Sequence, residues 1–249
     1  MRTLKTLIIM AALLLSLPAM ADLRDDLRHQ DGTVHLACDA RDDVNANCRT
    51  VTIHGDEVIT EAHDGLVHLV LRLDDGEVED LEVRCGGKAR GRERRAEDLG
   101  RYPAADVAAY CLDLVDTLDD RDEAEDAVVA VALVDHETWR DLARLARDKR
   151  RHHGVRESAM FWLGVHAGDK AVADLAHVAN DDDEDVDLRS HAVFALSQAL
   201  DNDVDAALET LGSIATENPH AEVRRNALFW LAQHDDERVV DLFERILLD

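Results

Sequence analysis

The chain has 249 residues, of which 54 are acidic and 28 basic, so its formal net charge is −26. This acidity argues against a generic nucleic-acid binder, because such proteins need clustered cations to displace counterions from phosphates. Hydrophobic residues make up 46% of the chain and proline occurs three times, which is the composition of a globular protein. The length suits one domain or two small ones.

Residues 1–21 have the features of a secretory signal peptide. Two basic residues precede an apolar run from Leu7 to Leu17, and the small residues Ala19 and Ala21 offer a cleavage site. The run is too short to span a bilayer comfortably and is followed at once by the charged residue Asp22. We therefore expect an exported protein, periplasmic or secreted, that has no transmembrane segment after processing.

Four cysteines remain after that segment, and an even number in an oxidising compartment predicts two disulfides. Three connectivities are possible, and we expect the local pairs Cys38–Cys48 and Cys85–Cys111. The alternative is a zinc site formed by Cys38 and Cys48 with nearby histidines. Because their spacing is not that of a zinc finger, we expect no metal there.

Residues 22–101 are predicted to form a small antiparallel β region. Strand candidates cover residues 33–37, 50–60 and 66–73, and the last alternates apolar and polar side chains. An Asp-Asp-Gly turn then leads to a return strand over residues 77–85, which makes this the most marked hairpin of the sequence. A glycine-punctuated loop follows.

Residues 102–249 are predicted to be helical and to contain an internal repeat. Segments that begin at Val155, Leu188 and Val223 share the pattern hydrophobic-Arg-x-x-Ala-x-x-x-Leu, at offsets of 33 and 35 residues. Each is followed by an acidic turn and a second amphipathic segment, and a degenerate copy precedes them. A single helical hairpin cannot bury its apolar face alone, so stacked copies predict an α-solenoid. The expected repeats are residues 124–150, 154–181, 186–217 and 221–249.

This pattern resembles HEAT-type repeats over residues 124–249, particularly the short HEAT-like repeats of phycobilisome lyase proteins. The Phe-Trp-Leu runs at 161–163 and 229–231 are similar to those of exported bacterial HEAT repeat domain-containing proteins. HEAT repeats often carry an aspartate six residues before the arginine, and here only Asp183 before Arg189 fits that pattern. The resemblance implies a protein-binding scaffold and no reaction.

The core of the repeats is predicted from equivalent apolar positions on one helical face. Neighbouring aromatic side chains could instead form a binding face, but their helical phase favours burial between adjacent repeats. The predicted core residues are Val155, Ala159, Phe161, Trp162, Leu163, Leu188, Ala192, Phe194, Leu196, Val223, Ala227, Phe229, Trp230 and Leu231.

The acidic run from Asp181 to Asp185 offers hard oxygen ligands, so a calcium loop is conceivable. An EF-hand loop needs glycine at its sixth position and glutamate at its twelfth, where Val186 and Ala192 stand. We expect a solvated acidic loop instead. The thirteen histidines include no helical metal-binding motif and are expected to be scattered and solvated, so no metal and no cofactor are predicted.

A basic stripe is predicted at Arg140, Arg144, Arg147 and Arg151, whose spacing of four, three and four residues places them on one face of a helix. The stripe is a candidate docking site for an anionic partner. The alternative is that these arginines pair with surrounding carboxylates of the same chain.

No catalytic constellation is present: the sequence lacks a nucleophile elbow, a phosphate-binding glycine loop and a haem-attachment motif. We therefore expect non-catalytic recognition of another protein on the surface formed by stacked second helices. Two alternatives remain, namely an enzyme-accessory or lyase-like protein that handles a small molecule, and a structural periplasmic protein.

Overall fold

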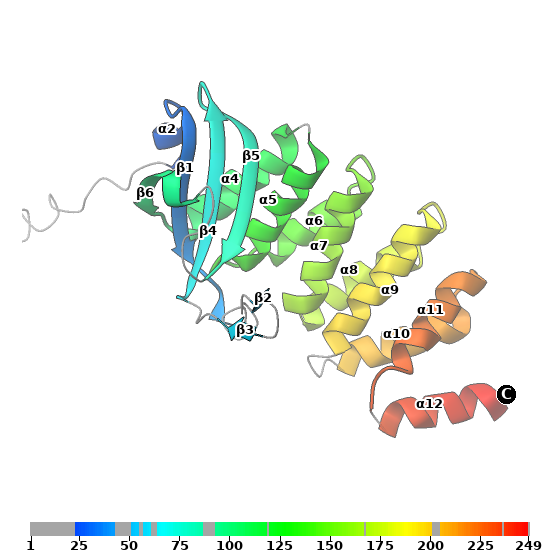
Figure 1. Cartoon of the computed structure of the whole chain (residues 1–249). Helices are drawn as coiled ribbons and strands as arrows, with labels where there is room; N and C mark the ends of the chain where they lie inside the picture. The colour runs from blue at the N-terminus through cyan, green and yellow to red at the C-terminus, as the bar shows by residue number, and fades with distance from the viewer. Residues whose placement is uncertain are drawn as a thin grey trace, which may run out of the picture.

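The computed structural model describes residues 23–42, 51–54, 57–60, 64–86, 93–118, 120–166, 168–200, 205–235 and 237–248. The protein is mainly helical, with a small sheet near the N-terminus from which the helices extend toward the C-terminus (Figure 1). The predicted signal peptide lies outside the described residues. In the part of the chain that is described, no helix is both long and apolar enough to cross a membrane.

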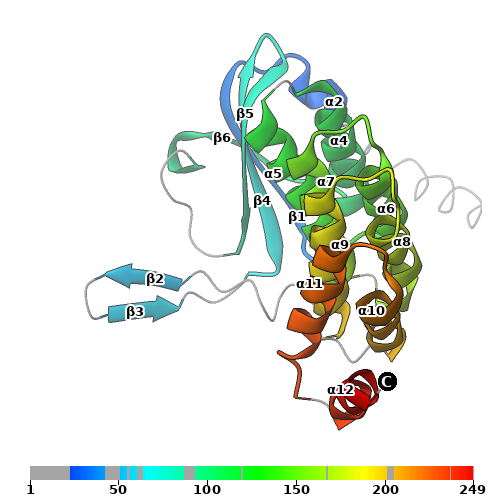
Figure 2. The same cartoon turned by 90° about the vertical axis from the view of Figure 1, so that its right-hand side faces the viewer.

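The main sheet has four strands in the order β5-β4-β1-β6. The short helix α2 (Leu23–Leu27) precedes β1 (Gly32–Asp39), which pairs antiparallel with β4 (Leu66–Asp74). The predicted hairpin between β4 and β5 (Glu77–Cys85) is confirmed, and its turn places Asp75 and Gly76 at positive φ, 48° and 81°. A separate ribbon of β2 (Val51–His54) and β3 (Glu57–Thr60) projects away from the sheet (Figure 2).

Strand β6 (Glu97–Arg101) was not expected, because its segment was interpreted as loop. It pairs parallel with β1 at the edge of the sheet, and none of its residues is fully buried. A strand of this kind has no clear alternation of apolar and polar residues. Its partner is distant in the sequence, so the sequence pattern alone carries no signal for it.

One face of the sheet forms a core with two helices. The alternate residues Val34, Leu36 and Cys38 of β1 are fully buried, as are Leu69 and Leu71 of β4. Helix α4 (Ala104–Thr117) packs on β1, and α5 (Arg121–Leu133) packs on β4 and β5. The alternation of the strands therefore determines which face the helices cover.

The expected cysteine pairs are wrong, because Cys38 and Cys111 are free thiols. Both lie in the core between β1 and α4. Cys85 is disulfide-bonded, and Cys48 lies outside the described residues. Burial raises the pKa of Cys38 to about 12 and also raises that of Cys111, so neither thiol is a good nucleophile at neutral pH.

Each predicted repeat contains a pair of helices. The pairs are α5 with α6 (Trp139–Arg147), α7 (His153–His166) with α8 (Asp169–Ala179), α9 (Val186–Leu200) with α10 (Asp205–Glu217), and α11 (Ala221–Leu231) with α12 (Glu237–Leu248). Asp120 caps α5 by accepting a hydrogen bond from the Asp122 amide at 2.9 Å. The periodicity of the sequence thus predicted the helices and their order.

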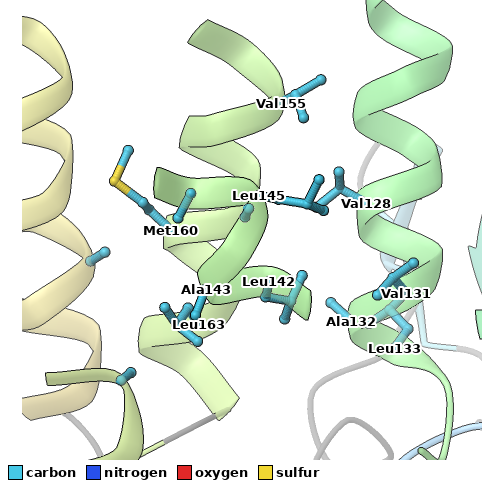
Figure 3. Close-up of a cluster of buried hydrophobic side chains, with 14 of the residues drawn as sticks. Val128, Val131, Ala132, Leu133, Leu142, Ala143, Leu145, Val155, Met160 and Leu163 are labelled. Atoms are coloured by element: carbon cyan, nitrogen blue, oxygen red, sulfur yellow. The ribbon is translucent and has the colours of Figure 1, made fainter. Parts of the chain in front are cut away.

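The first helices of the pairs pack side by side, with α7 between α5 and α9 and with α9 between α7 and α11. The second helices α6, α8 and α10 form a neighbouring column (Figure 2). Buried side chains of α5, α6 and α7 interlock across the two columns, including Val128, Leu142 and Leu163 (Figure 3). Burying one such leucine stabilises the fold by about 2 kcal/mol.

Candidate interaction surface

A row of aromatic side chains crosses three consecutive first helices. Phe161 of α7 stacks on Phe194 of α9 with ring centroids 6.0 Å apart, and Phe194 lies 4.9 Å from Trp230 of α11. Phe229 contacts Trp230 edge-to-face at 5.1 Å. These separations are those of favourable aromatic pairs, so the four rings form one contiguous unit, which we name the aromatic track.

The aromatic track is not the closed core that the sequence predicted. Phe229 is 54% exposed, so its prediction as a core residue is wrong, and the other three rings are partly exposed. Among the described helices, none follows α11 in the first-helix column, which leaves Phe229 without a covering neighbour. Trp162 is also partly buried. The prediction is confirmed for Val155, Ala159, Leu163, Leu188, Ala192, Leu196, Val223, Ala227 and Leu231, all of which are buried.

A cavity of about 600 Å³ lies where the end of β1 meets the turn between α5 and α6. Backbone hydrogen bonds form this junction, from the Arg41 amide to the Leu133 carbonyl at 3.0 Å and from the Asp135 amide to the Asp39 carbonyl at 2.8 Å. The lining combines two tryptophans with charged side chains from both parts of the molecule. The lining residues are Arg41, Asp42, Asp135, His136, Glu137, Thr138, Trp139, Leu142, Trp162, His166 and Lys170.

Trp162 joins the cavity to the aromatic track. Its indole lines the cavity and also meets Phe161 edge-to-face at 5.1 Å. On the cavity side, the imidazole of His166 stacks on the indole with centroids 5.2 Å apart and an angle of 12° between the ring planes. The track and the cavity therefore meet at Trp162 of α7.

The cations around Trp139 are already engaged within the molecule. Lys170 Nζ lies 2.9 Å from Glu137 Oε1 and 5.5 Å from the centre of the Trp139 ring. The guanidinium of Arg140 lies 4.7 Å from the same ring, which is a cation–π distance. Hydrogen bonds from Lys170 and from Trp139 Nε1 hold the pKa of Glu137 below its usual value.

The arginine stripe does not lie on one helix, because α6 ends at Arg147 and Arg151 lies in the turn before α7. Arg144 pairs with Asp141 at 3.1 Å, and Arg147 pairs with Asp174 at 3.0 Å. Arg151 pairs with Asp116 and Asp148, while Arg140 lies on Trp139. These contacts favour the alternative in which the arginines pair within the chain.

The acidic loop after α8 is not wholly solvated, because Glu184 is buried. Its carboxylate accepts two hydrogen bonds from the Arg156 guanidinium, one of them at 3.0 Å, and Arg156 is only 2% exposed. Arg156 Nε donates to the Ala146 carbonyl at 2.9 Å. The hydrogen bonds from Arg156 hold the pKa of Glu184 below its usual value. Arg156 thus joins the loop to the preceding repeat, and no group of three or more His, Cys, Asp or Glu side chains in the described part of the chain is placed to hold a metal ion.

Two histidines on the other face of the sheet also depart from the solvated state that was expected. His35 Nε2 lies 3.0 Å from His68 Nδ1, and the remaining ring nitrogens lie 3.1 Å from Asp98 and 2.9 Å from Asp64. The Gly100 amide and His35 lower the pKa of Asp98. Hydrogen bonds from His68 and the Leu66 amide lower that of Asp64, against the opposing effect of burial. This network links β6, β1 and β4 into one unit.

No protein-family model matches this sequence, and no curated protein matches it either. The chemistry of the surface is therefore the basis for assigning a role. It offers contiguous partly exposed aromatic rings and a mixed aromatic and acidic cavity. Sequence reasoning found the aromatic residues but assigned them to the core, and it missed the cavity, whose lining comes from distant segments.

Proposed function

We propose that this protein is an exported, non-catalytic scaffold that binds another protein on the surface formed by α7, α9 and α11. The single observation that carries the proposal is the aromatic track, whose rings lie in contact across three repeats while Phe229 remains 54% exposed. Aromatic side chains are enriched at the centres of protein interfaces. The expected surface on the second helices has no comparable row among the described residues.

We further propose that the four helical pairs act as a HEAT-like α-solenoid. Support comes from the 33- and 35-residue offsets of the pattern and from the side-by-side packing of successive first helices. Export is supported by the signal-peptide features of residues 1–21. The two buried thiols give no support to thiol-based lyase chemistry, because burial raises the pKa of both.

The test is affinity capture from an extract of the source cells, with the unchanged protein, Phe229→Ser and Val240→Ser as the three baits. Phe229 is largely exposed, so the substitution should leave the fold intact while it removes apolar contact area. Val240→Ser is the matched control, because Val240 is 58% exposed on α12 and lies outside the aromatic track. A stoichiometric partner that is lost with Phe229→Ser and retained with Val240→Ser supports the proposal. Equal capture by all three baits contradicts it.

A further inference from the structure

We propose that the cavity at the end of the aromatic track binds a cationic side chain, arginine or lysine, from a basic segment of the protein partner. This inference rests on the proposed function and names the chemistry of the partner. It follows from three properties of the cavity and of the chain: the carboxylates that pair with no described residue, the tryptophan walls and the net charge.

The first property is the distribution of charge within the cavity. Three carboxylates line it, those of Asp42, Asp135 and Glu137, against the two permanent cations of Arg41 and Lys170. Lys170 pairs with Glu137, and Arg41 donates to the His136 carbonyl at 3.3 Å. Asp42 and Asp135 are exposed and form no ion pair with any residue that the structure describes. These two carboxylates are therefore the ones that a cationic ligand can reach.

The second property is the pair of indoles. Trp139 lies within cation–π distance of Lys170 and Arg140, so its ring attracts cations, although these two belong to the chain itself. Trp162 provides an apolar wall that continues into the track. An arginine or lysine side chain combines an apolar stem with a charged end, and it can lie along indole faces while the charge reaches a carboxylate.

The third property is the net charge of −26. A field of this sign accelerates encounter with basic partners and repels acidic ones. An acidic peptide would have to displace Lys170 from Glu137 and would meet two further carboxylates. Charge complementarity therefore selects a basic segment, whose apolar residues can follow the track from Trp162 to Phe229.

The experiment uses two capped pentapeptides that differ in one side chain, Ac-Gly-Leu-Arg-Leu-Gly-amide and the same peptide with citrulline in place of arginine. Citrulline keeps the shape of arginine and removes its charge. Binding is followed by NMR at the indole N–H signals of the three tryptophans. Trp139 and Trp162 line the cavity, whereas Trp230 does not. We expect the arginine peptide to shift the signals of Trp139 and Trp162 first and to bind at least tenfold more tightly than the citrulline peptide.

The variant Asp42→Asn/Asp135→Asn should weaken binding of the arginine peptide about tenfold. Glu209→Gln/Asp241→Asn is the matched control, because it removes the same charge from exposed residues of α10 and α12 that do not line the cavity. Equal binding of the two peptides, or equal weakening by both variants, overturns the inference. If Phe229→Ser abolishes partner capture while Asp42→Asn/Asp135→Asn does not, the proposed function stands and this inference fails. If neither affects capture, the proposed function fails.

Discussion

Two arginines at equivalent positions of successive repeats occupy different chemical environments. Arg156 pairs with the buried Glu184 and donates to the Ala146 carbonyl. Arg189, 33 residues later, is only 6% exposed, yet its Nε and Nη1 atoms have no hydrogen-bond partner in the described part of the chain. The carbonyl of Ala179, equivalent to that of Ala146, accepts instead from the Asn218 side chain at 3.1 Å. In the later repeat, the side-chain amide of Asn218 thus takes the place of the acidic partner. It donates to the carbonyl that would otherwise accept a hydrogen bond from Arg189.

This difference predicts opposite effects of the same substitution. Arg156→Met leaves the Glu184 carboxylate buried and unpaired and should cost about 3 kcal/mol of unfolding free energy or more. Arg189→Met removes unsatisfied donors and should be neutral or stabilising by up to about 1 kcal/mol. Urea unfolding of both variants measures this. Equal losses would show that packing of the arginine stem, not its bonding, determines the effect.

The environment of Asp126 on α5 disfavours the charged form of its carboxyl group. Burial and, to a smaller extent, the nearby carboxylates of Glu125, Asp122 and Glu82 together raise its pKa to about 6. Because the folded-state pKa exceeds the ordinary value of 3.8, the folded protein holds this proton more tightly than the unfolded chain does. The contribution of Asp126 to stability is therefore complete below the ordinary value and is lost as the pH rises through about 6.

Asp126→Asn should accordingly stabilise the protein at neutral pH by about 1 kcal/mol, a value reduced for the partial exposure of the side chain. At about pH 3 the two proteins should be equally stable, because the carboxyl group is then largely protonated in both the folded and the unfolded chain. Thermal unfolding at the two pH values provides the comparison, and Glu209→Gln on α10 is the exposed control. A gain of the same size at both pH values would contradict the electrostatic explanation.

At the scale of elements, the contact between α7 and α9 depends on one glycine. A Cβ atom at Gly164 would lie 2.1 Å from the Ala195 carbonyl oxygen, so the helices approach more closely than any other residue allows. Gly212 of α10 differs, because its added Cβ would meet only the Leu242 side chain at 3.2 Å.

Gly164→Ala should therefore destabilise the protein by about 3 kcal/mol, since backbone must shift. Gly212→Ala should be neutral or stabilising by up to about 1 kcal/mol, because alanine favours the helix and a leucine side chain can move. Chemical unfolding followed by circular dichroism tests both. Similar losses in the two variants would indicate that helix packing tolerates no added methyl group, whatever the neighbouring atom.

Local patterns predicted the elements that interact with close sequence neighbours. The β4–β5 hairpin followed from the alternation of side chains around a turn, and the helical pairs followed from the repeated spacing of apolar residues. Strand β6 was missed because its pairing with β1 is distant and leaves it unburied. Phe229 was wrongly assigned to the core because its equivalence to positions in the other repeats predicts a neighbouring helix on both sides. In the described structure, no first helix packs on the far side of α11. The cavity requires residues 41–42 to meet residues 135–170, a juxtaposition that no local pattern encodes.

At the scale of the whole molecule, the charge balance sets how stability responds to salt. Salt weakens attractive surface pairs such as Arg147 with Asp174, and it also screens repulsion among like charges. The chain has 54 acidic and 28 basic residues, so even if every basic side chain paired with one carboxylate, 26 carboxylates would have no cationic partner. We therefore expect the repulsion among the excess carboxylates to outweigh the attraction within the surface ion pairs.

We expect the free energy of unfolding to rise by about 1 kcal/mol, or Tm by about 2–4 °C, between roughly 0.01 and 1 M sodium chloride. Thermal scans across this range measure the effect, and a neutral osmolyte at matched osmolarity controls for changes in hydration. The same screening should weaken binding of the arginine peptide, because that attraction is between opposite charges. A fall in Tm with salt would mean that the paired arginines, rather than the excess carboxylates, dominate the electrostatics of the fold.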